Sequence, residues 1–260
     1  MSEAVLHPLP NRVDVLREQF LSVGLSLRRE ALTVAGVAGL VSVWAAWLQA
    51  TRPFSLGMEV EPAAGMPVAM LALLVPMAVW KGEGPAQRGY HHAMPVQQGT
   101  HAVAKALSGL VWLLAAVGAY FGWLMLLAAF TGGRVESMPA WRWLTPFAGV
   151  TVTYLLGSAL TLRVAHAWRW LGGALVGYLF LNAMQAATGM GALLGLVNTA
   201  LAGPLGVTTV ITGEVPRQVH RSGVFYAYGP SAAGWMLALW LWLAIAISLF
   251  LWSAYRQPER

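Results

Sequence analysis

The sequence contains no cysteine and few charged residues. Its 260 residues include 10 Asp and Glu and 16 Lys and Arg, so charged residues make up 10% of the chain. A soluble domain carries about 25% charged residues to cover its surface. Without cysteine there are no disulfides, no thiol catalysis and no cysteine metal sites. The low charge, combined with 58% hydrophobic residues, excludes both a soluble globule and an intrinsically disordered chain.

Several motifs that define common activities are also missing. The chain has no Gly-x-x-x-x-Gly-Lys-Ser/Thr loop to cradle phosphates, no Gly-x-Ser-x-Gly, no His-Glu-x-x-His and no aspartate pair for Mg²⁺. The net charge of +6 comes from scattered basic residues and forms no stripe for nucleic acid. We therefore expect no enzymatic activity in this chain by itself, no bound cofactor or metal, and no nucleic-acid partner.

Apolar runs dominate the rest of the sequence. A helix needs about 20 apolar residues to cross roughly 30 Å of hydrocarbon. Six runs without acidic, basic or histidine residues approach or exceed that length: 31–50, 66–80, 106–130, 144–162, 171–191 and 235–255. They predict an all-α polytopic membrane protein with six transmembrane helices.

The distribution of basic residues predicts the orientation. Eleven of the 16 Lys and Arg lie in the termini and in the loops on the same side, and five lie on the other side. By the positive-inside rule, both termini are cytoplasmic and the protein is a multi-pass protein of the cell (inner) membrane. Residues 81–105 then form a cytoplasmic loop and residues 256–260 a cytoplasmic tail.

Residues 1–30 precede the first span and contain an amphipathic segment. Its apolar residues recur at helical spacing and give one stripe: Val13, Leu16, Phe20, Val23 and Leu27. This pattern predicts an interfacial helix held by membrane lipids. Two interpretations stay open, namely a simple anchor and an elbow helix that packs on a cytoplasmic partner.

The segment 192–234, between the last two predicted spans, is apolar in its first half but is interrupted by Asn198, Gly203 and Pro204. Short broken helices that re-enter the outer leaflet fit this pattern, and so does a full seventh span; charge counts do not separate the two. Within the spans, Gly118 with Gly122 and Gly173 with Gly177 form small-x-x-x-small pairs that predict helix packing.

The loop 81–105 carries the most specific pattern. It offers Glu83 and Gly89, then Met94-Pro95-Val96, and Ala104-Lys105 at the start of the third span. This order resembles the permease subunits of type-2 ABC exporters, although Gln97-Gln98 replaces the usual Ser-Arg and Pro85 comes early. The amphipathic N-terminal helix, the six spans and the broken outer segment are similar to that family too. For the segment 192–234, the resemblance implies re-entrant helices before the last span rather than a seventh span.

The resemblance implies a function and a set of partners. The chain would be the permease subunit of an ABC transporter and would export an amphipathic or hydrophobic substrate. A separate ATP-binding cassette ATPase would hold ATP and Mg²⁺, and a second permease copy, or a similar permease, would complete a dimer. A coupling helix near residues 83–92 would dock on the ATPase through Glu83, Arg88, Tyr90, His91 and His92.

The resemblance also implies that the second and fifth spans line the substrate path. The residues concerned share a face within each span: Met66, Met70 and Met77 in the second, and Tyr178, Asn182 and Gln185 in the fifth. Ordinary helix packing explains the same residues. An alternative function is a membrane-embedded enzyme or assembly factor that uses the cytoplasmic-face histidines. For the histidines of the loop, two interpretations stay open: a coupling helix that docks on a partner, and a solvated loop in which the His91-His92 pair has no role. A metal site at His91, His92 and His101 ranks below these two, because adjacent histidines diverge on a helix and no Asp or Glu completes the set.

Overall fold

The computed structural model describes residues 12–51, 59–81, 98–164, 166–188, 192–218, 225–228 and 231–255. Its long helices are α1 (Arg12–Ala50), α5 (Gln98–Phe130), α6 (Thr145–Arg163), α7 (Ala167–Thr188) and α10 (Ala232–Tyr255). Its shorter helices are η1 (Pro62–Gly65), α2 (Met66–Ala72), α3 (Val75–Val79), η2 (Ala140–Leu144), α8 (Ala192–Ala202) and α9 (Val207–Thr212). Two small strand pairs complete it: parallel β1 (Glu59–Val60) and β2 (Arg134–Val135), and antiparallel β3 (Val215–Gln218) and β4 (Phe225–Tyr228).

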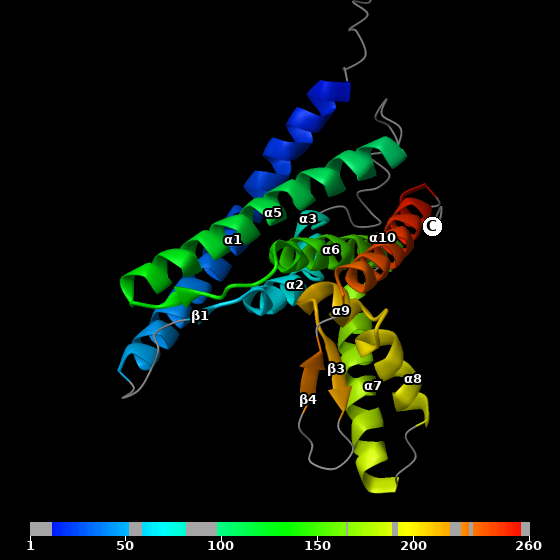
Figure 1. Ribbon diagram of the computed structural model, residues 1–260. Helices are drawn as coiled ribbons and strands as arrows, with labels where there is room; N and C mark the ends of the chain where they lie inside the picture. Colours follow the sequence, from blue (N-terminus) through cyan, green and yellow to red (C-terminus); the bar gives the residue numbers. More distant parts are fainter. Residues whose placement is uncertain are drawn as a thin grey trace, which may run out of the picture.

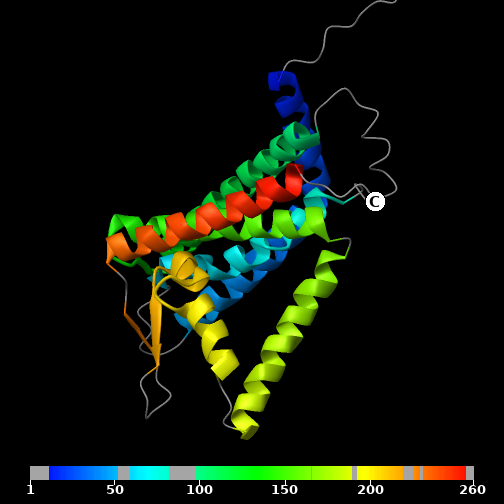
Figure 2. The same ribbon diagram turned by 90° about the vertical axis from the view of Figure 1, so that its right-hand side faces the viewer.

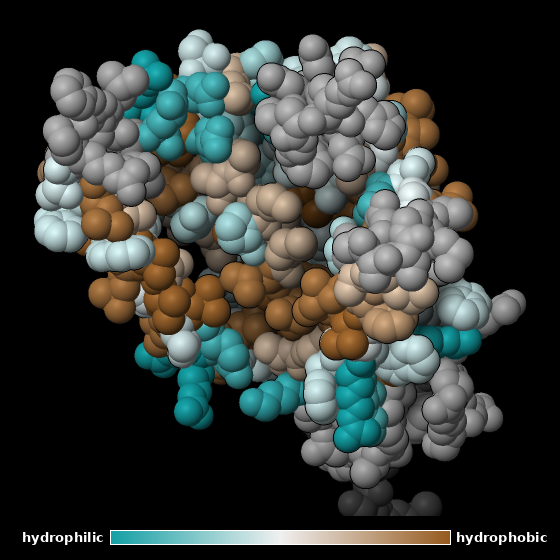
Figure 3. Space-filling model, turned by 90° about the horizontal axis from the view of Figure 1, so that it is seen from below, coloured by the Kyte–Doolittle hydropathy of each residue, from teal (hydrophilic) through white to brown (hydrophobic). Residues whose placement is uncertain are grey.

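Among the described residues, five helical stretches are long and apolar enough to cross a membrane. They are Leu16–Leu48, Gly99–Phe130, Ala140–Arg163, Leu194–Thr212 and Ala232–Tyr255. Hydrophobic side chains fill the middle of the face seen in Figure 3, and hydrophilic side chains gather towards its margins. The protein is therefore an all-α, multi-pass membrane protein.

The five stretches do not reproduce the six predicted spans, since two of the six differ. The second predicted span consists of the short helices α2 and α3, and the fifth is α7, whose mean hydropathy is lowered by Arg169, Asn182 and Gln185. In their place, Leu194–Thr212 of the broken outer segment is long enough to count as a span, although it contains two helices, α8 and α9.

Helix α1 is continuous where the sequence predicts an interfacial helix followed by a span. Its 39 residues correspond to about 58 Å at 1.5 Å per residue, well beyond the roughly 30 Å of hydrocarbon. No proline interrupts it, and α5 lies along it (Figure 1). Phe20 stacks on Trp112 of α5 at 4.9 Å between ring centroids, and Val23 is buried. Part of the predicted amphipathic stripe therefore packs on α5 rather than facing lipid.

Helix α6 is the centre of the packing. It contacts α2, α3, α5, α9 and α10. Small residues allow this crowding: Gly157 approaches the Leu73 carbonyl so closely that a Cβ would lie 2.4 Å from its oxygen, and Gly149 lies directly against Ile211 of α9. Tyr154 and Val150 are fully buried between these neighbours.

The break between α2 and α3 explains the short second span. Pro76 has no N–H to donate, and the Leu73 N–H donates to Met70 at 3.3 Å, as in a 3₁₀ turn, rather than to Ala69. The freed Ala69 carbonyl accepts a hydrogen bond from the Thr153 hydroxyl of α6 at 2.8 Å. A hydroxyl on one helix thus satisfies the backbone group that the break exposes on another.

Helix α7 stands apart from this packed region. It diverges from the other long helices in Figure 2 and makes its main contacts with α8. Its large apolar side chains are exposed, for example Val176 at 66% and Phe180 at 62%. The small-residue pairs at 118/122 in α5 and 173/177 in α7 meet no neighbour within 4 Å, so the part of the chain that the structure describes does not make the helix packing they predict.

Candidate functional site

The predicted coupling residues Glu83, Arg88, Tyr90, His91 and His92 lie outside the described residues. The structure does describe both ends of their loop, at Lys81 after α3 and at Gln98, where α5 begins. The site can therefore be built from the helices that hold these two ends.

The first end of the loop is tied to α1. Lys81 Nζ lies 3.6 Å from Glu30 Oε1, and both side chains are largely solvent-exposed, so this ion pair is weak in energy. The other carboxylate oxygen of Glu30 and the indole N–H of Trp80 are buried and have no hydrogen-bond partner among the described residues. The ion pair places the middle of α1 beside the start of the loop.

The second end of the loop leads into α5 through a buried lysine. Lys105 is 9% exposed, and its ammonium lies 5.1 Å from the centroid of the Trp80 ring. A cation over an indole face is a favourable contact, and more so where water is partly excluded. Because Trp80 also sits beside the Glu30–Lys81 pair in the chain, α1, α3 and α5 meet at the base of the loop.

The predicted path residues lie on two separate parts of the chain. Met66 and Met70 are exposed on α2 and Met77 is half-buried on α3, both of which pack on α6. Tyr178 is on α7, where its hydroxyl lies 3.3 Å from Oδ1 of Asn198 on α8. The side chains of Asn182 and Gln185 lie outside the description. The described side chains of this set, on α2, α3 and α7, therefore do not come together in one site.

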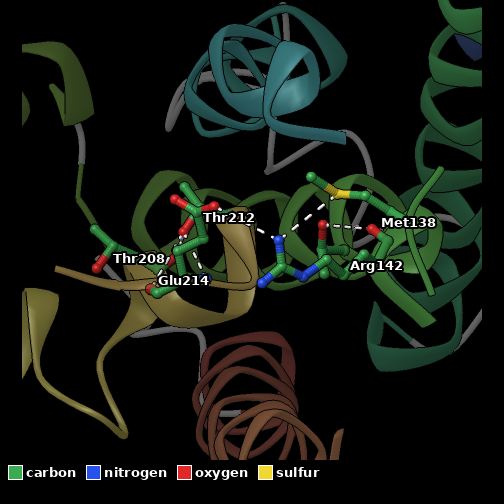
Figure 4. A network of polar contacts seen from close by, with 6 residues as sticks. Met138, Arg142, Thr208, Thr212 and Glu214 are labelled. Atoms are coloured by element: carbon green, nitrogen blue, oxygen red, sulfur yellow. Dashed lines mark hydrogen bonds and ion pairs between the residues drawn. The ribbon is translucent and has the colours of Figure 1, made fainter. Parts of the chain in front are cut away.

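A polar corner joins α9 to the start of α6 (Figure 4). Arg142 in η2 reaches Glu214 with 3.7 Å between Nη1 and Oε1, and it also contacts Met138 Sδ at 3.6 Å. Gly213 has φ 69°, the left-handed conformation that ends α9 and turns the chain towards Glu214. Thr212 Oγ1 accepts the Glu214 N–H at 3.2 Å. Arg142 and Glu214 are 19% and 35% exposed, so water only partly screens the pair.

The other end of α9 is fixed at greater depth along α10. Trp235, in the first turn of α10, donates to the Val210 carbonyl at 3.3 Å, and Trp242 donates to the Leu205 carbonyl at 2.8 Å. Seven residues of helix separate the two indoles, which is about 10 Å. The turn 203–206 therefore lies near the middle of α10, and α9 runs from there back towards the end at which α10 begins.

The turn itself is satisfied by side chains. Thr208 donates to the Leu201 carbonyl at 2.7 Å, and Thr209 donates to the Gly203 carbonyl at 2.8 Å. Gly206 approaches the Leu201 carbonyl to a distance that would leave no room for a Cβ. These bonds account for a broken helix inside an apolar segment, because backbone irregularity at depth requires partners from the protein.

Sequence reasoning missed most of these contacts. The Arg142–Glu214 and Glu30–Lys81 pairs join residues more than 50 positions apart, and no local spacing connects them. A usable signal did exist for the outer segment: Thr208 and Thr209 follow Gly203-Pro204 within five residues, and hydroxyls beside a break are suited to its freed carbonyls.

The described residues contain no group of three or more His, Cys, Asp or Glu side chains that could hold a metal ion. No protein-family model, curated protein or solved structure matches the chain. The features that bear on function are therefore the loop base, the exposed α7 and the α8–α9 unit, which we define as residues 192–213.

Proposed function

We propose that the chain is the membrane-spanning permease subunit of an ABC exporter, with two copies working alongside two ATPase subunits. The observation that carries this proposal is the α8–α9 unit. Its turn lies level with the middle of α10 and its end returns to the start of α10, as a pair of re-entrant helices before the last span would do. The resemblance in residues 83–105 points to the same family.

In this proposal the chain crosses the membrane six times with both termini in the cytoplasm. The second crossing is made by α2 and α3, and the fifth by α7. The loop 82–97 then faces the cytoplasm and docks on the ATPase. Movement of the loop would reach α1 through the Glu30–Lys81 pair and α5 through the Trp80–Lys105 contact.

The exposed α7 supports a second permease copy. Its large apolar side chains are exposed in the described part of the chain, and the methionines of α2 lie on another part of the same chain. A second copy would bring α7 of one chain near α2 of its partner and so assemble the path. A wall of methionine with uncharged polar groups suits an amphipathic or hydrophobic cargo.

Isolation of the tagged full chain from its native membranes tests the partnership. In mild detergent with ATP and Mg²⁺, the chain is expected to bring with it an ATPase that contains the phosphate-cradling loop. Glu83→Lys is expected to abolish recovery of that ATPase, whereas Glu136→Lys, a charge reversal in the loop after β2, should leave it unchanged.

Two outcomes would contradict the proposal. Recovery of the chain without any such ATPase, or equal recovery with Glu83→Lys, would remove the coupling role. An activity that is lost with His91→Ala while the ATPase stays bound would favour the alternative of an enzyme or assembly factor.

The lack of cysteine permits direct tests of topology and dimerisation. Val135→Cys should react with a membrane-impermeant maleimide in intact cells, and Asp14→Cys only after permeabilisation; the reverse pattern would overturn the orientation. Val176→Cys on α7 should form cross-linked dimers with a short bismaleimide. Trp240→Cys on α10 is the matched control, because these residues are exposed to 66% and 65%. Equal cross-linking at both positions would argue against a specific α7 interface.

A further inference from the structure

The α8–α9 unit is held at two points of different character. At its deep end, the turn 203–206 is fixed by hydrogen bonds from Trp242, Thr208 and Thr209. At its outer end, α9 is tied to the start of α6 by the Arg142–Glu214 ion pair (Figure 4). Between these points, Thr209, Val210 and Ile211 are at most 3% exposed against α6 and α10.

We infer that the Arg142–Glu214 pair is a latch: it holds α9 in its seat on α6, and its release lets the outer end of α9 lift while the turn 203–206 stays attached to α10. The significance of this movement for transport rests on the proposed function. There it would be the opening of the outer end of the path.

The membrane setting explains why one ion pair can control α9. Within lipid, separating apolar helix faces costs little hydrophobic free energy, because acyl chains replace the protein contacts. Hydrogen bonds and ion pairs then decide whether a short helix stays packed against its neighbours. Among the described residues, the polar contacts of this kind along α9 are the Trp235 bond to Val210 and the Arg142–Glu214 pair. Of these two, the second connects the end of α9 to η2, directly before α6.

Because of the charges around the latch, removing Arg142 and removing Glu214 should have different effects on α9. Glu61 lies close enough to Glu214 for the two carboxylates to repel each other, and Glu136 and Glu59 add to the negative charge of this rim. Arg134 is paired with Glu59 at 3.1 Å. Loss of Arg142 therefore leaves Glu214 in a negative surrounding, whereas loss of Glu214 also removes a repulsion. Arg142→Gln should open the latch more than Glu214→Gln.

A single engineered cysteine reports the movement. Ile211 is 3% exposed and faces Gly149 of α6, so Ile211→Cys in the full chain, reconstituted in lipid nanodiscs, should react slowly with a polar maleimide. Adding Glu214→Gln should speed the reaction about tenfold, a value between those for exposed and buried ion pairs. Arg142→Gln should speed it further, and the double charge swap Arg142→Glu with Glu214→Arg should restore slow reaction.

The Glu59→Gln variant is the matched control, because it breaks the Glu59–Arg134 ion pair on the same rim without touching α9. Hydrogen exchange of the backbone amides of 207–213 provides a second measurement that needs no cysteine; it should rise with Glu214→Gln and stay unchanged with Glu59→Gln. The inference is overturned if Glu214→Gln leaves both readouts unchanged, if the swap fails to restore them, or if Glu59→Gln has the same effect. All readouts use the chain alone, so they stand or fall independently of any ATPase partner.

Discussion

Helices α6 and α7 follow each other in the chain and have similar lengths, 19 and 22 residues, yet their surroundings are opposite. More than half of the α6 stretch is buried, at 56%, the largest value among the five candidate spans. Helix α7 exposes nearly all of its large apolar side chains. Both helices are rich in glycine and apolar residues, so composition does not separate them.

The difference lies in what the small and hydroxyl residues face. On α6, glycine positions admit the backbone of neighbouring helices, and Thr153 satisfies a carbonyl on α2. On α7, the glycines 172, 173 and 177 have no neighbour within 4 Å among the described residues. In a membrane, where apolar surface alone gives helices little reason to associate, such close approaches and polar contacts identify the packed helix.

The largest expected effect is a difference in stability between two Gly→Ala variants: the one in α6 should be less stable than the unmodified protein, and the one in α7 should not. Gly157→Ala in α6 places a methyl group 2.4 Å from the Leu73 carbonyl oxygen, so it should destabilise the protein by about 3 kcal/mol through overpacking. Gly177→Ala in α7 meets nothing within 4 Å and should be neutral or stabilise by up to about 1 kcal/mol through helix propensity. Thermal unfolding of each variant in detergent measures both. Equal effects would show that the two helices are not packed differently.

A smaller effect is expected from one hydroxyl of α6. Thr153→Val keeps the side-chain shape but leaves the Ala69 carbonyl at the helix break without its donor, which should cost about 1 kcal/mol. The hydroxyl of Thr161, also on α6, donates to the carbonyls of Gly157 and Ser158 in the same helix. Thr161→Val should therefore change stability by less than about 0.5 kcal/mol. Unfolding temperatures of the two variants provide the comparison. A larger loss with Thr161→Val would contradict the role given to Thr153.

The contact between α7 and α8 should contribute less to stability than the Thr153 hydrogen bond does. Tyr178→Phe removes the contact to Asn198, and hydrogen bonds between membrane helices average about 0.6 kcal/mol. Asn198→Ala should therefore cost less in the Tyr178→Phe background than in the unmodified protein, by about that amount. A double-mutant cycle of unfolding temperatures measures the coupling. Fully additive losses would show that the two side chains act on separate neighbours.

The sequence predicts those features of α6 and α7 that depend on neighbouring residues, but not those that depend on contacts between residues far apart in the chain. Apolar runs predicted the helices at 144–162 and 235–255 closely, because length and hydropathy are local properties. The helix predicted at 106–130 begins earlier, at Gln98, because His101 and Lys105 interrupt the apolar run without ending the helix. The broken nature of the outer segment was also readable from Gly203 and Pro204, although whether it re-enters or crosses was not. The distinction between α6 and α7 was not readable, because it depends on which helix meets the carbonyls of α2 and the backbone of α9.

The candidate site also combines features that local sequence predicts with contacts that it does not predict. The loop 81–105 was predicted from its own residues, although residues 98–105 belong to α5. The base of the loop depends on Glu30, which comes from α1, and the latch joins Arg142 to Glu214 across 72 positions. Partners so distant are brought together only by the fold. The glycine pairs failed for the opposite reason: their spacing is a local signal for packing, but it does not say whether the neighbouring helix belongs to the same chain.

The smallest effect concerns the outer rim of the packed region, where burial carries an electrostatic cost. Partial burial of the otherwise exposed Glu61 raises the pKa of its carboxyl group above the ordinary 4.5, and repulsion from Glu136, Glu214 and Glu59 raises it further. The folded state therefore holds this proton more tightly than the unfolded state does, so the ionised carboxylate destabilises the fold above the raised pKa and has no such effect below 4.5, where both states are protonated.

Glu61→Gln should accordingly stabilise the protein at pH 7.5 and leave it unchanged at pH 4. Because the side chain is exposed and screened, the gain should be only a few tenths of a kcal/mol and should shrink in high salt. Glu59→Gln, which removes the partner of Arg134, should give no gain at pH 7.5; a gain as large as that of Glu61→Gln would mean that general negative charge, rather than the placement of Glu61, sets the stability of this rim.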